Sequence, residues 1–240
     1  MMRGPPEALF LPGFDGAGSL REPFLAALRE HHPVRAIDYP NRLLQTLNGY
    51  CRHAESQAPP ASPVILVAES FSGLVAARWA SMDPHVVALV LCGAFARDPI
   101  AWATSLAASV PAALRLGAAF LRPPPGNRDP ARLQWAKDLS RTLRALDDAV
   151  IGERLRIIAN EDLRPELGAL AIPVTLLQFE DDLVIGPGPR GELEEVCHNA
   201  HVVRFPGPHF AIETMPRECA EAIGPRLRSM TTTRATSGSP

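Results

Sequence analysis

The sequence has no apolar run long enough to cross a membrane and no excess of either charge. Its 240 residues include 24 lysines and arginines against 26 aspartates and glutamates, which gives a formal net charge of −2. A nearly neutral chain has no strong field to attract nucleic acid or an anionic membrane surface. We therefore expect neither nucleic acid nor a membrane as a partner. No apolar signal segment precedes the first strand, so we expect a cytoplasmic protein.

Cysteines are few, and none of them forms a Cys-x-x-Cys pair. The four lie far apart, at Cys51, Cys92, Cys197 and Cys219. This spacing does not suggest a thioredoxin-like redox motif or a disulfide framework. We expect reduced thiols, and Cys92 lies in an apolar run where a thiol acts as a small hydrophobic side chain.

Signatures of cofactor sites are missing as well. The glycine-rich stretch 12–18 follows an apolar strand at 8–11, but it has neither of the usual phosphate-binding patterns, Gly-x-x-x-x-Gly-Lys-Ser/Thr or Gly-x-Gly-x-x-Gly. A metal hydrolase could draw on Cys197, His198, His201 and His209, but their spacing matches no zinc signature. We therefore expect no cofactor and no metal.

Apolar strands alternate with amphipathic helices along most of the chain. The expected strands are 8–11, 34–39, 64–69, 86–92, 172–179 and 201–205. The expected helices are 20–29, 42–56, 71–82 and 215–227. This alternation predicts an α/β fold in one domain over 1–240, a mostly parallel sheet of about six strands with helices on both faces. Ligands of such sheets bind at the carboxyl ends of the strands.

The alternation stops between residues 95 and 164, where helical patterns rich in alanine, leucine and arginine follow one another. Such an insertion after a strand can cover the ligand site, so we expect a helical lid with an apolar acyl pocket. Its Trp102 and Trp135 are more often packing residues than substrate contacts. The tail 231–240 has low complexity, and we expect it to be disordered.

The clearest chemical signal is the segment Ala68-Glu69-Ser70-Phe71-Ser72-Gly73, which follows the strand at 64–69. A serine on a sharp turn between a buried strand and a helix projects its hydroxyl above the sheet, as a nucleophile does. The usual pattern is Gly-x-Ser-x-Gly, and here Ala68 and Ser72 occupy the two glycine positions. Ser70 is therefore a candidate nucleophile, with a helix-capping serine as the alternative interpretation. Glu69 has a structural or electrostatic role in this interpretation and no chemical step.

Two backbone amides are candidates for binding a negatively charged oxygen. The loop after strand 8–11 reads Pro12-Gly13-Phe14-Asp15-Gly16, and such a glycine-containing loop can bring an amide beside a nucleophile. We assign the Phe14 amide as one donor and the Phe71 amide as the second. The alternative is an ordinary loop between a strand and a helix.

Two further strand ends carry the remaining candidates. Glu180, Asp181 and Asp182 follow the strand at 172–179, and His209 follows the strand at 201–205. Each of these segments alone could be a solvated loop. The chain order of serine, acid and histidine, each after a strand, is that of a serine hydrolase built on such a sheet.

The chain resembles the α/β-hydrolase superfamily over residues 7–229. The resemblance rests on 11–16, on the Glu-Ser-Phe-Ser-Gly segment 69–73, on 179–184 and on Gly207-Pro208-His209-Phe210. It is closer to bacterial hydrolases with a Leu-Pro-Gly-x-Asp-Gly loop. The Gly-x-x-Asp-x-x-Val pattern of the family implies Asp182 as the catalytic acid, but Phe179 replaces its glycine and leaves Asp181 as an alternative.

This resemblance implies a serine hydrolase that cleaves a carboxylic ester or a related acyl bond. Its triad is Ser70, His209 and Asp182, and its oxyanion donors are the Phe14 and Phe71 amides. The expected partner is a small-molecule acyl substrate. An acyl thioesterase uses the same residues, and a catalytically silent ligand-binding module keeps the same fold. Neither the acyl specificity nor the oligomeric state follows from the sequence.

Overall fold

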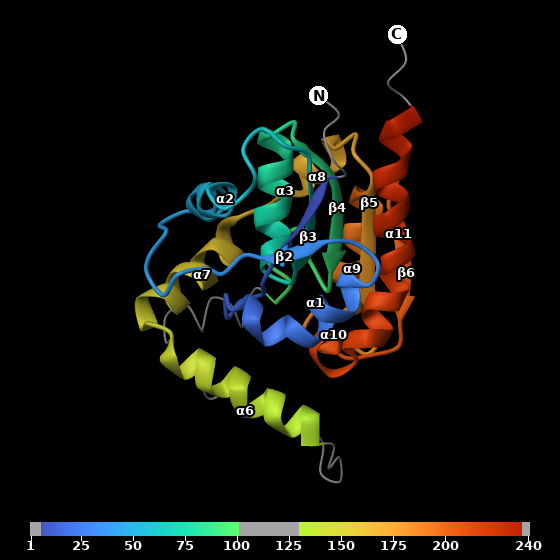
Figure 1. Cartoon of the computed structure of the whole chain (residues 1–240). Coiled ribbons are helices and arrows are strands. Elements are labelled where there is room, and N and C mark those ends of the chain that lie inside the picture. Colours follow the sequence, from blue (N-terminus) through green and yellow to red (C-terminus); the bar gives the residue numbers. More distant parts are fainter. Residues whose placement is uncertain (1–5, 101–129, 237–240) are drawn as a thin grey trace.

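Six parallel strands form one sheet in the order β2-β1-β3-β4-β5-β6 (Figure 1). The computed structural model describes residues 6–100 and 130–236, except for the side chains of 130–133 and 231–236. The strands are β1 (Glu7–Leu11), β2 (Val34–Ala36), β3 (Val64–Glu69), β4 (Val86–Cys92), β5 (Val174–Phe179) and β6 (His201–Phe205). The predicted six-stranded parallel sheet is confirmed.

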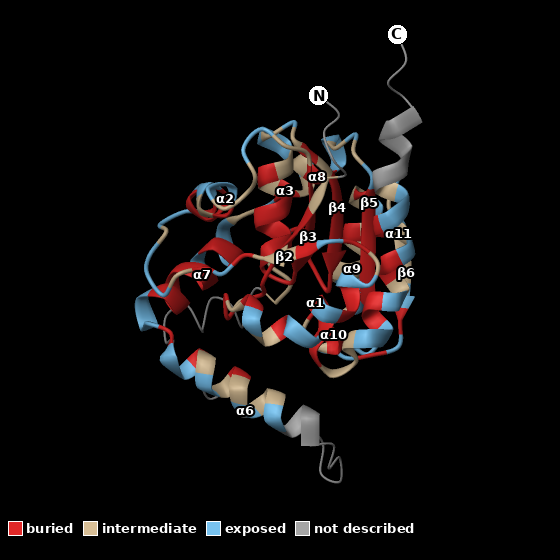
Figure 2. Cartoon of the chain, viewed as in Figure 1, coloured by how far each residue is buried: buried red, intermediate tan, exposed pale blue. Residues whose placement is uncertain are grey.

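Most of the sheet is buried on both faces, as Figure 2 shows for its central strands. This burial explains why β3, β4 and β5 read as continuous apolar runs and not as alternating patterns. Successive side chains still divide between two cores. Leu66 and Ala68 of β3 belong to one core, and Ile65 and Val67 belong to the other.

The helices form a layer on each face of the sheet. One core contains side chains of α2 (Leu47–Glu55), α3 (Ser72–Met82), α8 (Arg164–Ala169) and α9 (Pro187–Val196). The other contains side chains of α1 (Glu22–Arg29), α10 (Ala211–Thr214) and α11 (Pro216–Thr236). The short 3-10 helix η1 (Gly18–Arg21) leads into α1. Helix α2 begins later than expected because the Thr46 hydroxyl caps it by accepting from the Gly49 amide.

The closing helix is longer than the sequence predicts. Helix α11 continues to Thr236, so residues 231–236 extend the closing helix, whereas we expected that helix to end at residue 227. A helix that has already formed adds residues at low cost, which explains how this polar segment can remain helical. The last four residues, 237–240, lie outside the described part of the chain.

Only part of the expected lid lies within the described residues. Residues 101–129, with Trp102, lie outside them. The remainder contains α6 (Pro130–Ala145) and α7 (Asp148–Asn160), and Figure 1 shows α6 beyond the end of the sheet where β4 ends. Apolar side chains of α6 and α7 form a small cluster that packs against Phe14, Leu20 and Phe210.

The order of the strands creates a switch point between β1 and β3. The chain first adds β2 on one side of β1 and then places β3 on the other side. Connections on the two sides leave in opposite directions, so a crevice opens between the loops that follow β1 and β3. The segment after Leu11 and the segment after Glu69 therefore lie next to each other.

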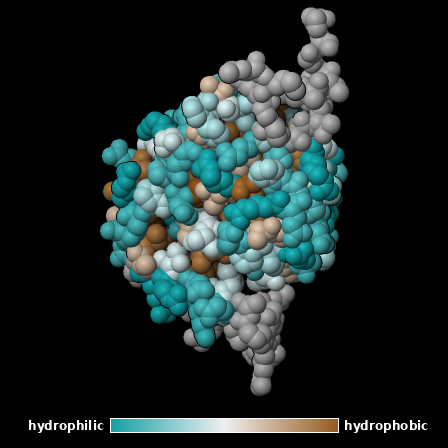
Figure 3. Space-filling view, viewed as in Figure 1, coloured by the Kyte–Doolittle hydropathy of each residue, from teal (hydrophilic) through white to brown (hydrophobic). Residues whose placement is uncertain are grey.

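The exposed surface is mainly polar. The face seen in Figure 3 is largely hydrophilic, with apolar residues in separate small areas. The large apolar side chains that are exposed in the described parts of the chain are Leu43, Met82 and Leu183. None of the helices described has the length and hydropathy of a membrane span.

Replacement of Leu66 by alanine tests the contribution of the sheet core. Leu66 is fully buried at 0% exposure in the central strand β3. We expect Leu66→Ala to lower the free energy of unfolding by about 2–5 kcal/mol, because the lost methyl groups leave a cavity. Urea unfolding measures this change. Leu183→Ala, at a side chain that is 96% exposed, is the matched control and should change stability by less than about 0.5 kcal/mol. Equal midpoints for the two variants would contradict this assignment of the core.

Candidate active site

Ser70 occupies the sharp turn between β3 and α3. Its φ angle is +49°, in the left-handed region that residues other than glycine rarely adopt. The turn is held by hydrogen bonds from the Ser70 amide to the Cys92 carbonyl at 2.9 Å and from the Gly73 amide to the Ser70 carbonyl at 2.8 Å. A strained serine fixed in this way is the geometry of a nucleophile elbow.

Gly73 explains how the helix approaches the sheet so closely. A Cβ atom at this position would lie 2.6 Å from the Cβ of Ala94, closer than real atoms approach. The required glycine therefore stands one residue after the position given by the Gly-x-Ser-x-Gly pattern. Ser72, at the position where the pattern has glycine, is fully buried, so its hydroxyl lies inside the protein.

A chain of hydrogen bonds joins Ser70, His209 and Asp182. The Ser70 Oγ atom lies 3.1 Å from His209 Nε2, and His209 Nδ1 lies 2.7 Å from Asp182 Oδ2. A carboxylate only accepts hydrogen bonds, so Nδ1 of the ring carries the hydrogen and Nε2 of the neutral ring accepts from the serine hydroxyl. This arrangement leaves Nε2 free to take the proton of Ser70.

Between the two candidate acids, Asp182 is the one that contacts the histidine. Its side chain is buried, and its other oxygen, Oδ1, accepts hydrogen bonds from the Val184 amide at 2.8 Å and the Ile185 amide at 2.7 Å. These bonds hold the carboxylate so that Oδ2 faces His209. Asp181 is exposed, and its amide donates to the Gly207 carbonyl at 3.1 Å.

The two expected oxyanion donors lie on the two loops that meet at the switch point. Phe14 follows β1, and Phe71 follows Ser70 directly. Their rings pack edge to face with centroids 6.4 Å apart. Within residues 6–100 and 130–236, no hydrogen bond occupies the amide of either residue. Both N–H groups therefore lack a hydrogen-bond partner among the described residues.

Gly93 was not singled out in the sequence. It follows β4 with a φ angle of +51°, and a Cβ atom there would lie 3.0 Å from the Phe179 ring and 3.4 Å from His209 Nδ1. The glycine leaves room for the histidine ring beside Phe179. A glycine directly after a buried strand is the signal that could have identified it.

The profile of the alpha/beta hydrolase family matches residues 8–222. The chain belongs to the alpha/beta hydrolase family. A search of curated proteins gives no match. Within the described residues, no group of three histidine, cysteine or acidic side chains has the arrangement of a metal site.

Solved structures of other family members share the fold at low sequence identity. An enol-lactonase from Burkholderia xenovorans superimposes with a TM-score of 0.76 and 18% identity over 95% of this chain and 92% of that one. A bromoperoxidase from Bacillus anthracis superimposes with a TM-score of 0.76 and 16% identity over 96% of this chain and 93% of that one. An N-formylmaleamic acid deformylase from Pseudomonas putida superimposes with a TM-score of 0.70 and 14% identity over 93% of each chain. At these identities the likeness establishes the fold alone.

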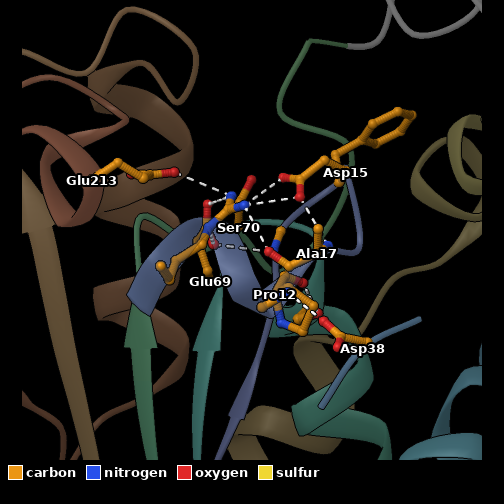
Figure 4. Close-up of polar contacts among 12 residues, drawn as sticks. Pro12, Asp15, Ala17, Asp38, Glu69, Ser70 and Glu213 are labelled. Carbon is orange, nitrogen blue, oxygen red and sulfur yellow. Dashed lines mark hydrogen bonds and ion pairs between the residues drawn. The ribbon is translucent and has the colours of Figure 1, made fainter. Parts of the chain in front are cut away.

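A buried cluster of charges lies beside Ser70 (Figure 4). The Arg21 guanidinium binds both oxygens of Glu69, with Nε at 2.6 Å and Nη2 at 2.5 Å, and its Nη1 donates to Asp15 at 2.8 Å. Burial by itself would lower the pKa of Arg21, but its acidic neighbours outweigh burial and raise that pKa well above its usual value. Arg21 was missed because a polar residue at the start of an amphipathic helix ordinarily indicates exposure.

Glu213 is the third acid of this cluster and differs from the other two. Its Oε1 lies 3.1 Å from Arg21 Nη2, yet neither of its carboxyl oxygens has a hydrogen-bond partner. Burial, with the neighbouring Glu69 charge, raises the pKa of Glu213 well above the usual range. Arg21 already neutralises one of its two bonded carboxylates, so burial beside the second favours the neutral form of Glu213.

The raised pKa of Glu213 predicts a pH dependence of stability that Glu213→Gln removes. The folded protein binds this proton more tightly than the unfolded chain does. Its contribution is therefore complete below the unfolded pKa of about 4.3 and is lost as the pH rises toward the folded value. We expect the stability of the variant relative to the wild type to increase with pH by up to about 1.4 kcal/mol per unit. Urea unfolding from pH 5 to 9 measures this slope.

The exposed residue Glu195 supplies the control for this experiment. Glu195→Gln should follow the wild-type profile of stability against pH. If Glu213→Gln also ran parallel to the wild type, Glu213 would be ionised in the folded protein and the assignment above would be wrong.

Proposed function

We propose that the protein is a serine hydrolase that cleaves a carboxylic ester or a related acyl bond through an acyl-enzyme. The observation that carries the proposal is the hydrogen-bonded series from Ser70 through His209 to Asp182, which starts at a serine with a φ angle of +49°. A capping serine does not need this backbone strain or a buried histidine beside its hydroxyl. Membership of the alpha/beta hydrolase family supports the same conclusion.

In the acylation step, Ser70 Oγ attacks the substrate carbonyl while its proton passes to His209 Nε2. Asp182 stabilises the imidazolium ion that forms. The Phe14 and Phe71 amides donate to the oxygen that becomes negatively charged in the tetrahedral intermediate. The bond to the leaving group then breaks, and His209 returns the proton to the leaving oxygen.

In the deacylation step, water is the nucleophile and Ser70 Oγ is the leaving group. His209 takes a proton from the water as it attacks the acyl-enzyme carbonyl, and the same two amides bind the second oxyanion. The intermediate collapses with release of the carboxylic acid, and the proton returns to Ser70. A thioester substrate would follow the same steps with a thiol as leaving group.

An apolar wall beside the histidine favours an apolar acyl group. The Phe210 ring lies 5.0 Å from the His209 ring and 5.0 Å from the Trp135 ring, measured between centroids. Trp135 and Phe210, with Phe14 and Leu20, pack against the apolar cluster of α6 and α7. Apolar surfaces next to a few polar groups are typical of small-molecule sites.

Labelling with a fluorophosphonate tests the nucleophile. We expect one equivalent of the probe on Ser70, identified by intact mass and peptide mapping, because the phosphonyl group reacts as an acyl centre does. Ser70→Ala should not react, and His209→Ala should react several orders of magnitude more slowly, since the serine loses its base. Folded wild-type protein that takes up no label would favour a silent binding module. Panels of esters and thioesters then distinguish the two substrate classes.

The adjacent aspartates offer a matched pair of variants. We expect Asp182→Asn to lower kcat for p-nitrophenyl butyrate by about 10³- to 10⁴-fold, because an amide favours the wrong tautomer of His209. The exposed Asp181→Asn variant should retain kcat near the wild-type value. The opposite ranking of the two variants would exclude Asp182 as the acid.

A further inference from the structure

One peptide unit of the loop after β1 is bound at both ends by the nucleophile elbow. The carbonyl of Pro12 accepts a hydrogen bond from the Ser72 hydroxyl. The amide of Gly13, in the same peptide unit, donates to Glu69 Oε2 at 3.1 Å. Glu69 directly precedes Ser70, and Ser72 follows it by two residues. Figure 4 shows Pro12 beside Glu69 and Ser70.

The Ser72 hydroxyl is placed between two oxygen atoms, one of which can only accept a hydrogen bond. The Tyr39 hydroxyl lies 2.7 Å from Ser72 Oγ. Since the Pro12 carbonyl can only accept, Ser72 gives its hydrogen to Pro12 and accepts from Tyr39. Ser72, at the position where the elbow usually has glycine, thus forms a hydrogen bond to the neighbouring loop that glycine could not form.

Glu69 is held in place by Arg21. The guanidinium binds both carboxylate oxygens, and both side chains are buried, at 1% exposure for Arg21 and 4% for Glu69. A bidentate pair of this kind fixes orientation as well as charge. The loop approaches so closely that a Cβ atom on Gly13 would lie 2.7 Å from Glu69 Oε1. A side chain at this point would displace the Glu69 carboxylate from Arg21.

The next two peptide units of the loop are also bound through their carbonyl groups. The Gly13 carbonyl accepts from the Gly16 amide at 3.0 Å, and the Phe14 carbonyl accepts from Arg154 Nη1 at 2.5 Å. The Phe14 amide lies between these fixed points and makes no hydrogen bond with the described residues. Its direction is therefore determined by bonds to its neighbours.

We propose that Glu69 and Ser72 are positioning residues that hold the Phe14 amide at the correct distance from Ser70 for binding the oxyanion. This role depends on the proposed serine hydrolase function. Both anchors belong to the same turn as the nucleophile, so the oxyanion donor and the attacking oxygen keep a constant relative position. Oxyanion stabilisation depends on donors that are already oriented before the charge develops.

Steady-state kinetics of Ser72→Ala, Glu69→Gln and the double variant test this role with p-nitrophenyl butyrate. We expect each single variant to lower kcat by about 10-fold or more and the double variant by up to about 10³-fold, the loss that follows removal of one oxyanion donor. KM should change little, because the oxyanion forms only in the transition state. Melting temperatures show whether each variant is folded.

The thiono analogue of the same ester separates this role from a general structural effect. Sulfur accepts hydrogen bonds weakly, so amide donors stabilise its negative charge less than that of oxygen. We expect the variants to lose activity toward the ester and to keep most of their activity toward the thiono ester. An equal loss on both substrates would overturn the proposal.

Two buried side chains whose polar atoms have no hydrogen-bond partner supply controls. Glu213→Gln changes an acid of the same cluster, and Thr175→Val removes a buried hydroxyl that has no partner. Both variants should keep the wild-type kcat. A loss in Glu213→Gln as large as that in Glu69→Gln would show that disturbance of the cluster, and not the bond to Gly13, is responsible.

The wild-type protein distinguishes failure of this proposal from failure of the function. If the wild type neither hydrolyses the ester nor takes up a fluorophosphonate, the serine hydrolase function is wrong. If the wild type does both, and folded Ser72→Ala and Glu69→Gln keep its kcat, the function stands and the positioning role is wrong. Ser72→Ala removes a single oxygen atom, so at least this variant is expected to fold.

Discussion

The pairing of β1 with β3 is the constraint on which the site depends. Leu11 pairs with Ala68 in a parallel register, so the two strands end at the same edge of the sheet. Neighbouring strands lie about 4.8 Å apart, which brings the loop after β1 within hydrogen-bonding reach of the elbow after β3. Parallel strands with helices on both faces leave only the strand ends for polar chemistry. Ser70, Asp182 and His209 all follow strands at this edge.

Buried charge at this edge is organised around one cation. Arg21 and the acids near it would each be costly to bury alone, and mutual hydrogen bonds reduce that cost. Glu69 and Asp15 are bonded to the guanidinium, whereas Glu213 remains close to it without a hydrogen bond. Such a cluster adds little net stability compared with apolar packing. Its effect is geometric, because its bonds orient the loop that carries Phe14.

Much of the fold was predictable from the sequence because its signals are local. Buried parallel strands appear as apolar runs, and the six predicted strands are confirmed with shifts of a few residues. Ser70 was recognisable because a serine after such a strand, with a small residue two positions before it and another two positions after it, indicates a sharp turn. His209 was recognisable from its place after the last strand. Helix ends were less predictable, since Thr46 and the continuation to Thr236 depend on capping and propagation.

The sequence by itself therefore determined the positions of the strands along the chain, the elbow and the candidates at the strand ends, because each depends on residues adjacent in the chain. Tertiary structure decided which side chains meet. Asp182 and Asp181 are neighbours with the same chemistry, and only the path of the loop turns one of them toward His209. In the sequence Arg21 resembles an exposed helix residue. In the folded chain it is buried and paired with Glu69 at the end of β3. These contacts join residues far apart in the chain, so no local pattern encodes them.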